Sequence, residues 1–83
     1  MNAVGRIKAK VLLSANLRAI LEGRPEVITV EIDQPMSIKE LLVQIDINPL
    51  VVVMALVNGT KRSKDFRIEH DAEITLLGPV AGG

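Results

Sequence analysis

The 83-residue sequence predicts one small α+β domain, in which a mixed sheet of four or five strands carries one main helix on one face. Three observations support this fold class. Apolar side chains alternate with polar ones near both ends of the chain, as in half-buried strands. One segment in the middle has the apolar spacing of a helix. An Asn-Gly pair, which favours a hairpin turn, separates two later strand-like segments.

The first two strands are predicted from this alternation. Residues 7–14 alternate apolar side chains with lysine, leucine and serine, and residues 28–32 alternate isoleucine and valine with threonine and glutamate. We expect these two strands to pair antiparallel. The residues between them, which include Leu17 and Leu21, are expected to form a loop that ends near Pro25.

The middle of the chain predicts the helix. Ser37 stands three residues before Glu40, which is the spacing of a capping box. Apolar side chains then follow at the i, i+3, i+4, i+7 positions of one helix face, namely Ile38, Leu41, Leu42 and Ile45. The helix is expected to stop near Ile47-Asn48, because Pro49 disfavours a helical conformation in the residue before it.

An apolar segment runs without interruption from Leu50 to Val57. Such a run is typical of a strand that is covered on both faces or lies at the centre of a sheet. Its burial is expected to make the largest single apolar contribution to the core. Asn58-Gly59 comes next and is the dipeptide that type I′ turns prefer, because both turn positions need a positive φ. We therefore predict a hairpin here.

Two short alternating segments complete the predicted sheet. The first covers residues 66–69 and the second residues 74–77, with a turn at His70-Asp71 between them. The order of elements, ββαββ with or without a further strand, is that of the β-grasp fold. We therefore expect a β-grasp (ubiquitin-like) domain at residues 1–77 and a flexible C-terminal tail at residues 78–83.

Composition argues against several classes of function. The ten basic and ten acidic side chains cancel, so no net charge draws the chain to nucleic acid or to an anionic membrane. With no cysteine and one histidine, it has no thiolate nucleophile and too few groups for a Ser/His/Asp triad or a transition-metal site. No segment approaches the roughly 20 apolar residues that span a bilayer. We expect a cytoplasmic protein that binds no metal or cofactor directly.

The group best placed for chemistry is the C-terminal carboxylate of Gly83. The tail before it carries no charged side chain. Glycine has no Cβ, so the backbone of Gly82 and Gly83 can approach another surface closely. A tail of this kind can enter a narrow site on a partner protein.

The C-terminal part of the chain resembles a known family. The motifs are the ending LLGPVAGG from Leu76 to Gly83, Val57-Asn58-Gly59 in the strand and turn, and Asp71-Ala72-Glu73-Ile74 before the last strand. With them the chain resembles the small subunit of molybdopterin synthase and, more loosely, the sulfur carrier of thiazole synthesis. Both are ubiquitin-like sulfur carriers of the MoaD/ThiS family. Gly78 stands where the molybdopterin carriers commonly have a second proline, and a glycine there is expected to loosen the tail.

The resemblance implies a two-step reaction at Gly83. An E1-like adenylating enzyme uses ATP to form an acyl adenylate on the carboxylate, and sulfur then displaces AMP to leave a thiocarboxylate. The carrier is not a catalyst alone but would be the small subunit of a sulfurtransferase. The other implied partner is the large subunit of molybdopterin synthase, or else thiazole synthase, and the tail would enter it through Gly82 and Gly83.

The residues before the two glycines are the implied partner-binding residues. Pro79, Val80 and Ala81 are expected to pack in a groove of the partner, although Pro79 and Val80 also suit a simple strand end. If Leu77 and alternate residues of 51–56 are exposed, they form an apolar patch on which the large subunit docks.

Two polar features have simpler interpretations. Lys61, Arg62 and Lys64 follow the predicted hairpin turn and suit a solvated tip, with a site for phosphate or for an acidic partner as the alternative. His70 suits a polar turn residue.

Four functions remain open from the sequence. The first is a sulfur carrier for molybdopterin synthesis, and the second is a sulfur carrier for thiazole or another sulfur pathway. The third is a ubiquitin-like protein modifier, whose adenylated Gly83 passes to lysine amines. The fourth is a β-grasp interaction module with an inert tail.

Overall fold

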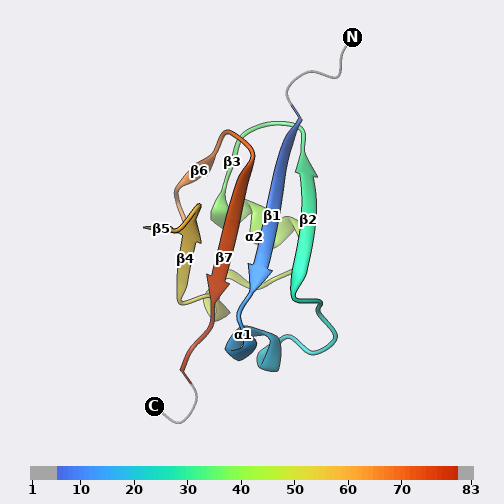
Figure 1. Cartoon of the computed structure of the whole chain (residues 1–83), viewed down its shortest axis with the longest axis vertical. Coiled ribbons are helices and arrows are strands. Elements are labelled where there is room, and N and C mark those ends of the chain that lie inside the picture. Colours follow the sequence, from blue (N-terminus) through green and yellow to red (C-terminus); the bar gives the residue numbers. More distant parts are fainter. Residues whose placement is uncertain (1–5, 81–83) are drawn as a thin grey trace.

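A computed structural model of the chain describes residues 6–80 and arranges five of its strands in one mixed sheet with the main helix across one face (Figure 1). The five strands are β1 (Ile7–Leu13), β2 (Val27–Ile32), β4 (Met54–Val57), β5 (Thr60–Arg62) and β7 (Ala72–Leu77). Their spatial order is β2-β1-β7-β4-β5. β1 and β7 run parallel, and the other neighbouring pairs are antiparallel. The predicted β-grasp fold is confirmed.

Shorter elements connect these strands. They are α1 (Ala15–Ile20), β3 (Met36–Ser37), α2 (Ile38–Gln44), the 3₁₀ turn η1 (Pro49–Val51) and β6 (Arg67–Ile68). β3 and β6 pair with each other in a separate two-stranded sheet. The Ile38 N–H at the start of α2 also donates to the Phe66 carbonyl at 3.0 Å. The segment before β7 therefore holds the N-terminal end of α2.

The predicted pairing of the first two strands is confirmed. The antiparallel register runs without interruption from Ile7 opposite Ile32 to Leu12 opposite Val27. Along β1 the odd-numbered residues are buried and the even-numbered ones are exposed or half-buried. The period of two in the sequence therefore matches the two faces of the sheet.

The loop predicted after β1 contains a short helix, α1, so this prediction is wrong. The Oγ of Ser14 accepts a hydrogen bond from the Leu17 N–H at 3.2 Å and caps the helix. Leu17 is fully buried. A six-residue helix has little stability of its own, and the burial of Leu17 provides the stability that the local sequence lacks.

The main helix, α2, begins where the sequence predicts. The Ser37 Oγ accepts from the Glu40 N–H at 3.0 Å, and the Glu40 carboxylate accepts from the Ser37 N–H at 2.9 Å, so the capping box is complete. The hydrogen bond from the Ser37 backbone holds the pKa of Glu40 below its ordinary value of 4.5. The residues of α2 that face the sheet, Ile38, Leu41 and Leu42, are buried.

α2 ends about one turn earlier than predicted. Gln44 is its last residue, and Asp46 adopts a left-handed φ of 64°. The N–H groups of Asp46 and Ile47 donate to carbonyls of the last turn at 3.0 and 2.8 Å, as in a Schellman motif. The Arg24 guanidinium donates to two more carbonyls there, at 2.8 and 2.6 Å. Pro49 therefore follows the helix end without causing it.

The apolar run from Leu50 to Val57 is not one buried strand. Its first residues belong to η1, which begins with Pro49. The Oδ1 of Asn48, the residue before η1, accepts from the Leu50 N–H at 2.9 Å. Only the last four residues form β4. Leu50 is 84% exposed and Val53 is 63% exposed. The prediction of a fully covered strand is wrong, because much of this run lies on the surface.

The Asn58-Gly59 turn is confirmed. Asn58 has a φ of 51° and Gly59 a φ of 87°, as a type I′ turn requires. The Asn58 side-chain oxygen also accepts from the Glu73 N–H at 2.9 Å, and the Asn58 N–H donates to the Glu73 carbonyl at 2.7 Å. The turn is therefore tied to the start of β7.

The core lies between the sheet and α2. Its largest fully buried side chains are Leu17, Ile32, Ile38, Leu41, Leu42, Ile47, Ile68, Ile74 and Leu76. Within residues 6–80 no polar or charged side chain is fully buried. The fold of this part of the chain therefore rests on apolar burial. It contains no helix with the length and apolar composition needed to cross a membrane.

Candidate functional site at the root of the C-terminal tail

β7 holds the start of the tail at the centre of the sheet. Its residues Ile74 and Leu76 are buried, and it pairs with β1 on one side and β4 on the other. At its end, the Leu76 carbonyl accepts from the Ser14 N–H at 3.0 Å, and the Leu77 carbonyl accepts from the Val53 N–H at 2.8 Å. The chain then leaves the sheet beside α1 (Figure 1).

Gly78, the first residue of the predicted tail, is buried against α1. Its N–H donates to the Ser14 Oγ at 3.4 Å, and a Cβ built on it would lie 3.0 Å from the Leu17 Cα. The expectation that a glycine loosens the chain here is wrong for this residue, since the missing Cβ is what lets the backbone lie against the helix. Sequence reasoning missed Ser14 and Leu17, although a serine three residues before a buried leucine is a usable signal of a capped helix.

Pro79 and Val80 follow on the surface. Both are exposed, and Val80 is 77% exposed. They present apolar surface next to the domain. The remaining predicted site residues, Ala81, Gly82 and Gly83, lie outside the described residues.

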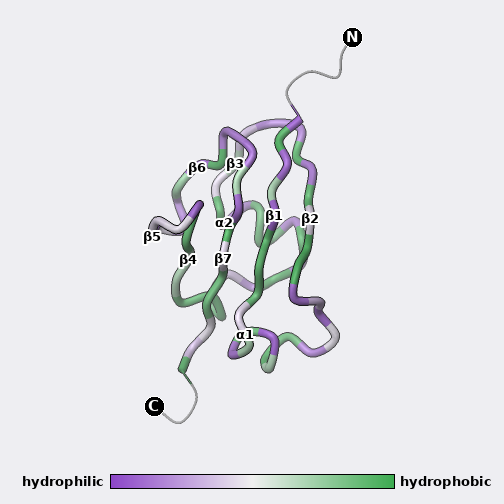
Figure 2. The backbone as a smooth tube through the Cα atoms, in the orientation of Figure 1, coloured by the Kyte–Doolittle hydropathy of each residue, from purple (hydrophilic) through white to green (hydrophobic). Residues whose placement is uncertain are grey.

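An apolar patch covers the outer face of the sheet next to the tail. We call it the tail-side patch, and it consists of Leu12, Val27, Met54, Leu56 and Leu77. Leu12 lies opposite Val27, and Thr75 of β7 lies between Leu12 and Leu56 in the same row. Leu77 lies opposite Met54 in the next row. All five side chains are half-buried or exposed. Figure 2 shows hydrophobic segments of β1 and β7 extending to this end of the sheet.

Charged residues occupy the other end of the same face. The Lys10 Nζ lies 3.9 Å from a Glu73 carboxylate oxygen, and Arg6 lies 3.1 Å from Glu31. The apolar end is thus the one next to the tail. Leu77 shares this face with Met54 and Leu56, but the three side chains are half-buried and not exposed as the prediction required. The apolar row also continues onto β1 and β2, which the sequence does not indicate, because strand order cannot be read from alternation alone.

The basic cluster after the hairpin separates into two parts. Lys61 and Arg62 are exposed on β5, and the Arg62 guanidinium carbon lies 4.7 Å from the centroid of the Phe66 ring. Lys64, in contrast, donates from its Nζ to two carbonyl oxygens at the η1 turn, at 2.8 and 3.0 Å. The prediction of a solvated tip is right for Lys61 and wrong for Lys64.

Replacing Lys64 by methionine is expected to lower the free energy of unfolding by about 1–3 kcal/mol, because two partly buried carbonyls lose charge-assisted hydrogen bonds. The matched change Lys61→Met removes an exposed charge and is expected to change it by no more than about 0.5 kcal/mol. Urea titration of both variants measures the difference. Equal stability of the two variants would mean that the Lys64 bonds contribute nothing.

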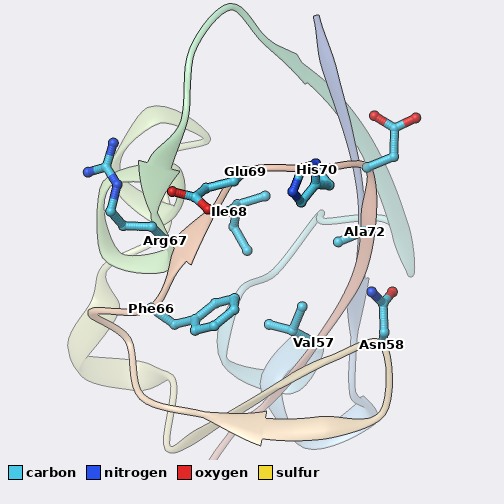
Figure 3. Close-up of a pocket in the computed structure, with 9 residues that line it drawn as sticks. Val57, Asn58, Phe66, Arg67, Ile68, Glu69, His70 and Ala72 are labelled. Carbon is cyan, nitrogen blue, oxygen red and sulfur yellow. The ribbon is translucent and has the colours of Figure 1, made fainter. Parts of the chain in front are cut away.

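A hollow of about 140 Å³ lies at the far end of the sheet from the tail (Figure 3). Val57, Phe66 and Ile68 line its interior, and Arg67 points away from it. His70 is exposed in the bend before β7, which confirms it as a turn residue. Within residues 6–80, no three His, Cys, Asp or Glu side chains converge as a metal-binding group.

Two solved structures from Haloferax volcanii share this fold. The solution structure of the HVO 2177 protein has a TM-score of 0.67 at 17% identity and covers 95% of this chain and 89% of its own. The crystal structure of SAMP1 has a TM-score of 0.68 at 18% identity and covers 92% of this chain and 99% of its own. At such identities the likeness shows the fold alone. A search of curated protein sequences gives no significant match.

The family is shown by a sequence model. The model of the ThiS family matches residues 11–83, which include the last three residues of β1, all later strands and the C-terminal Gly-Gly. The match therefore covers both the ubiquitin-like sheet and the tail that it carries. The chain belongs to the ThiS family.

Proposed function

We propose that this protein is a sulfur carrier that holds sulfur as a thiocarboxylate on Gly83. The observation that carries the proposal is the place from which the tail leaves. The tail leaves from the end of the central strand β7, beside the tail-side patch. Its next residues, Pro79 and Val80, are exposed. In a ThiS-family chain that ends in Gly82-Gly83, this arrangement presents the last carboxylate to a partner.

The chemistry divides into two balanced steps. A Gly83 carboxylate oxygen attacks the α-phosphorus of ATP, and pyrophosphate leaves. Sulfide then attacks the acyl carbon, the bond to AMP breaks, and AMP and a proton are released as the thiocarboxylate forms. A carboxylate is a poor acyl donor until it is adenylated, so this covalent activation replaces one difficult transfer by two easier ones. An E1-like enzyme would supply the nucleotide site and the acid–base groups.

The tail-side patch and the tail have different roles in this proposal. The patch docks the activating enzyme or the enzyme that receives the sulfur, because exposed apolar patches mark protein interfaces. Residues 79–83 can extend about 17 Å at 3.3–3.6 Å per residue. The carboxylate can therefore reach a site set back from the docked surface, with Pro79, Val80, Ala81 and Leu77 contacting the entrance.

For the pathway, we propose molybdopterin synthesis, with this chain as the small subunit of the synthase. Support comes from the ending Leu76–Gly83 and from the Asn58-Gly59 turn, which resemble that subunit. A carrier for thiazole or another sulfur pathway shares every step at Gly83. The accepting enzyme distinguishes them, since only the molybdopterin large subunit would convert its pterin precursor with the thiocarboxylated chain.

The test is the intact mass of the untagged protein after incubation with its activating enzyme, ATP and sulfide. The expected result is a gain equal to replacing one oxygen by sulfur, located at Gly83 and absent without ATP. No gain with the enzyme encoded by the same organism, shown to be active on another carrier, would overturn the proposal.

The same activation step serves a ubiquitin-like protein modifier. In that function a lysine amine attacks the adenylate in place of sulfide and forms an isopeptide bond. A mass gain in the test establishes the carrier, whereas adducts joined to lysine, with no thiocarboxylate formed, would establish the modifier.

A further inference from the structure

We infer that Gly78 is a positioning residue for the reaction at Gly83, because its contact with α1 fixes where and in which direction the tail leaves the domain. The inference rests on the proposed function for its catalytic consequence. The contact itself lies within the described structure, before the tail meets any partner.

Ser14 joins the helix and the strand end at this point. Its Oγ accepts from the Leu17 N–H at 3.2 Å, inside α1, and from the Gly78 N–H at 3.4 Å. Its own N–H donates to the Leu76 carbonyl at 3.0 Å. On the opposite side of β7, the Leu77 carbonyl is held by the Val53 N–H at 2.8 Å. The backbone is thus held from both sides up to Gly78, immediately before the exposed residues begin.

A glycine suits this contact because it has no Cβ. A Cβ at position 78 would lie 3.0 Å from the Leu17 Cα, 3.1 Å from its N and 3.2 Å from its Cβ. These distances are tighter than ordinary packing of carbon atoms, so the strand end and α1 would have to separate by a few tenths of an ångström. The Leu17 atoms cannot move aside easily, since two of them are backbone and the side chain is fully buried.

The other two glycines in residues 6–80 are required by backbone conformation and not by close packing. Gly23 and Gly59 have left-handed φ values of 86° and 87°, and a Cβ on either would meet nothing within 4 Å. Of these three glycines, Gly78 is the one placed by close approach and not by backbone conformation. Gly59 therefore offers a matched control in which a methyl group strains the fold at the opposite end of the sheet.

A shift of Gly78, where the tail leaves the domain, should move the Gly83 carboxylate. Pro79 follows directly, and its ring fixes its φ, so a shift at Gly78 passes into the start of the tail. Misplacing a reacting group by about 1 Å can cost about 100-fold in rate. Docking through the tail-side patch does not use Gly78. The consequence should therefore appear in kcat and not in KM.

The test compares Gly78→Ala with Gly59→Ala in ATP-dependent thiocarboxylation by the activating enzyme, at a temperature where both variants are folded. Gly78→Ala is expected to lower kcat about 3- to 10-fold with KM unchanged, because the shift at Gly78 is smaller than 1 Å. Gly59→Ala is expected to keep the wild-type kcat despite its strained turn. Ser14→Ala should lower kcat less than Gly78→Ala, and Ser14→Thr, which keeps the hydroxyl, should restore it.

An NMR measurement tests the same contact without activity. In Gly78→Ala the amide signals of Leu17 and Val80 are expected to shift, and the ¹⁵N relaxation of Val80 to show larger motion, whereas Gly59→Ala leaves both unchanged. A wild-type kcat for Gly78→Ala, or an equal loss in Gly59→Ala, would overturn the inference. The inference would also fail if Ser14→Ala lowered kcat and Ser14→Thr did not restore it. If wild-type protein gains no sulfur, the proposed function fails, and the NMR comparison still decides whether Gly78 fixes the tail.

Discussion

Deleting Gly82 and Gly83 is expected to abolish ATP-dependent thiocarboxylation completely. The deletion leaves the new carboxylate on Ala81 and moves it back by about 7 Å along the extended chain. Adenylation needs the carboxylate within bonding distance of the α-phosphorus, so the shortened tail cannot reach it from the same docked position. The free energy of unfolding is expected to change by no more than about 0.5 kcal/mol, because the buried core side chains all lie between Ile7 and Leu76 in the sequence.

A one-residue extension makes the matched control. Adding an alanine after Gly83 keeps the whole tail but moves the carboxylate forward by about 3.5 Å. It is also expected to block the reaction. Intact mass reports sulfur incorporation in both variants, and thermal unfolding reports stability. Sulfur gain in the shortened protein would mean that the reactive group is not the Gly83 carboxylate. No sulfur gain in any of the three proteins, wild type included, would favour the inert interaction module.

The sequence predicts the β-grasp fold because its strongest signals are local. The alternation along β1, the Ser37–Glu40 capping box and the Asn58-Gly59 turn each act within a few residues, and all three are confirmed. The predictions that are wrong concern features that depend on contacts between residues distant in the sequence. α1 forms because Leu17 is buried. α2 ends early at Gln44, and Arg24 binds the carbonyls of Ile45 and Asp46 that follow.

The apolar run after α2 shows a different limit. Hydrophobicity predicts burial, yet Leu50 and Val53 are exposed, and of the run only β4 joins the sheet. The sequence does not indicate which apolar residues serve the core and which serve a surface for a partner. For the site, it predicts the tail and Leu77, but Leu12 and Val27 join the tail-side patch only through the strand order.

Replacing Leu56 by aspartate is expected to weaken docking of the activating enzyme. Leu56 lies between Leu12 and the β5 edge in the tail-side patch, and it is only half-buried. A charge there must lose its hydration when the patch is covered. Central interface residues often cost 2 kcal/mol or more when changed, so KM should rise roughly 10- to 100-fold with kcat preserved. Steady-state kinetics of AMP release measures both constants.

The control is Thr29→Asp, which places the same side chain in a strand on the same face but outside the patch. Both variants carry the low strand propensity of aspartate, about 1 kcal/mol at most, and Leu56→Asp also loses the burial of a half-buried leucine. The kinetic constants are therefore compared at a temperature where unfolding measurements show both variants folded. Thr29→Asp is expected to keep the wild-type KM. An unchanged KM in Leu56→Asp would show that the enzyme docks elsewhere. A raised KM in Leu56→Asp beside a lowered kcat in Gly78→Ala would separate two functions of one end of the sheet, binding the partner and aiming the tail.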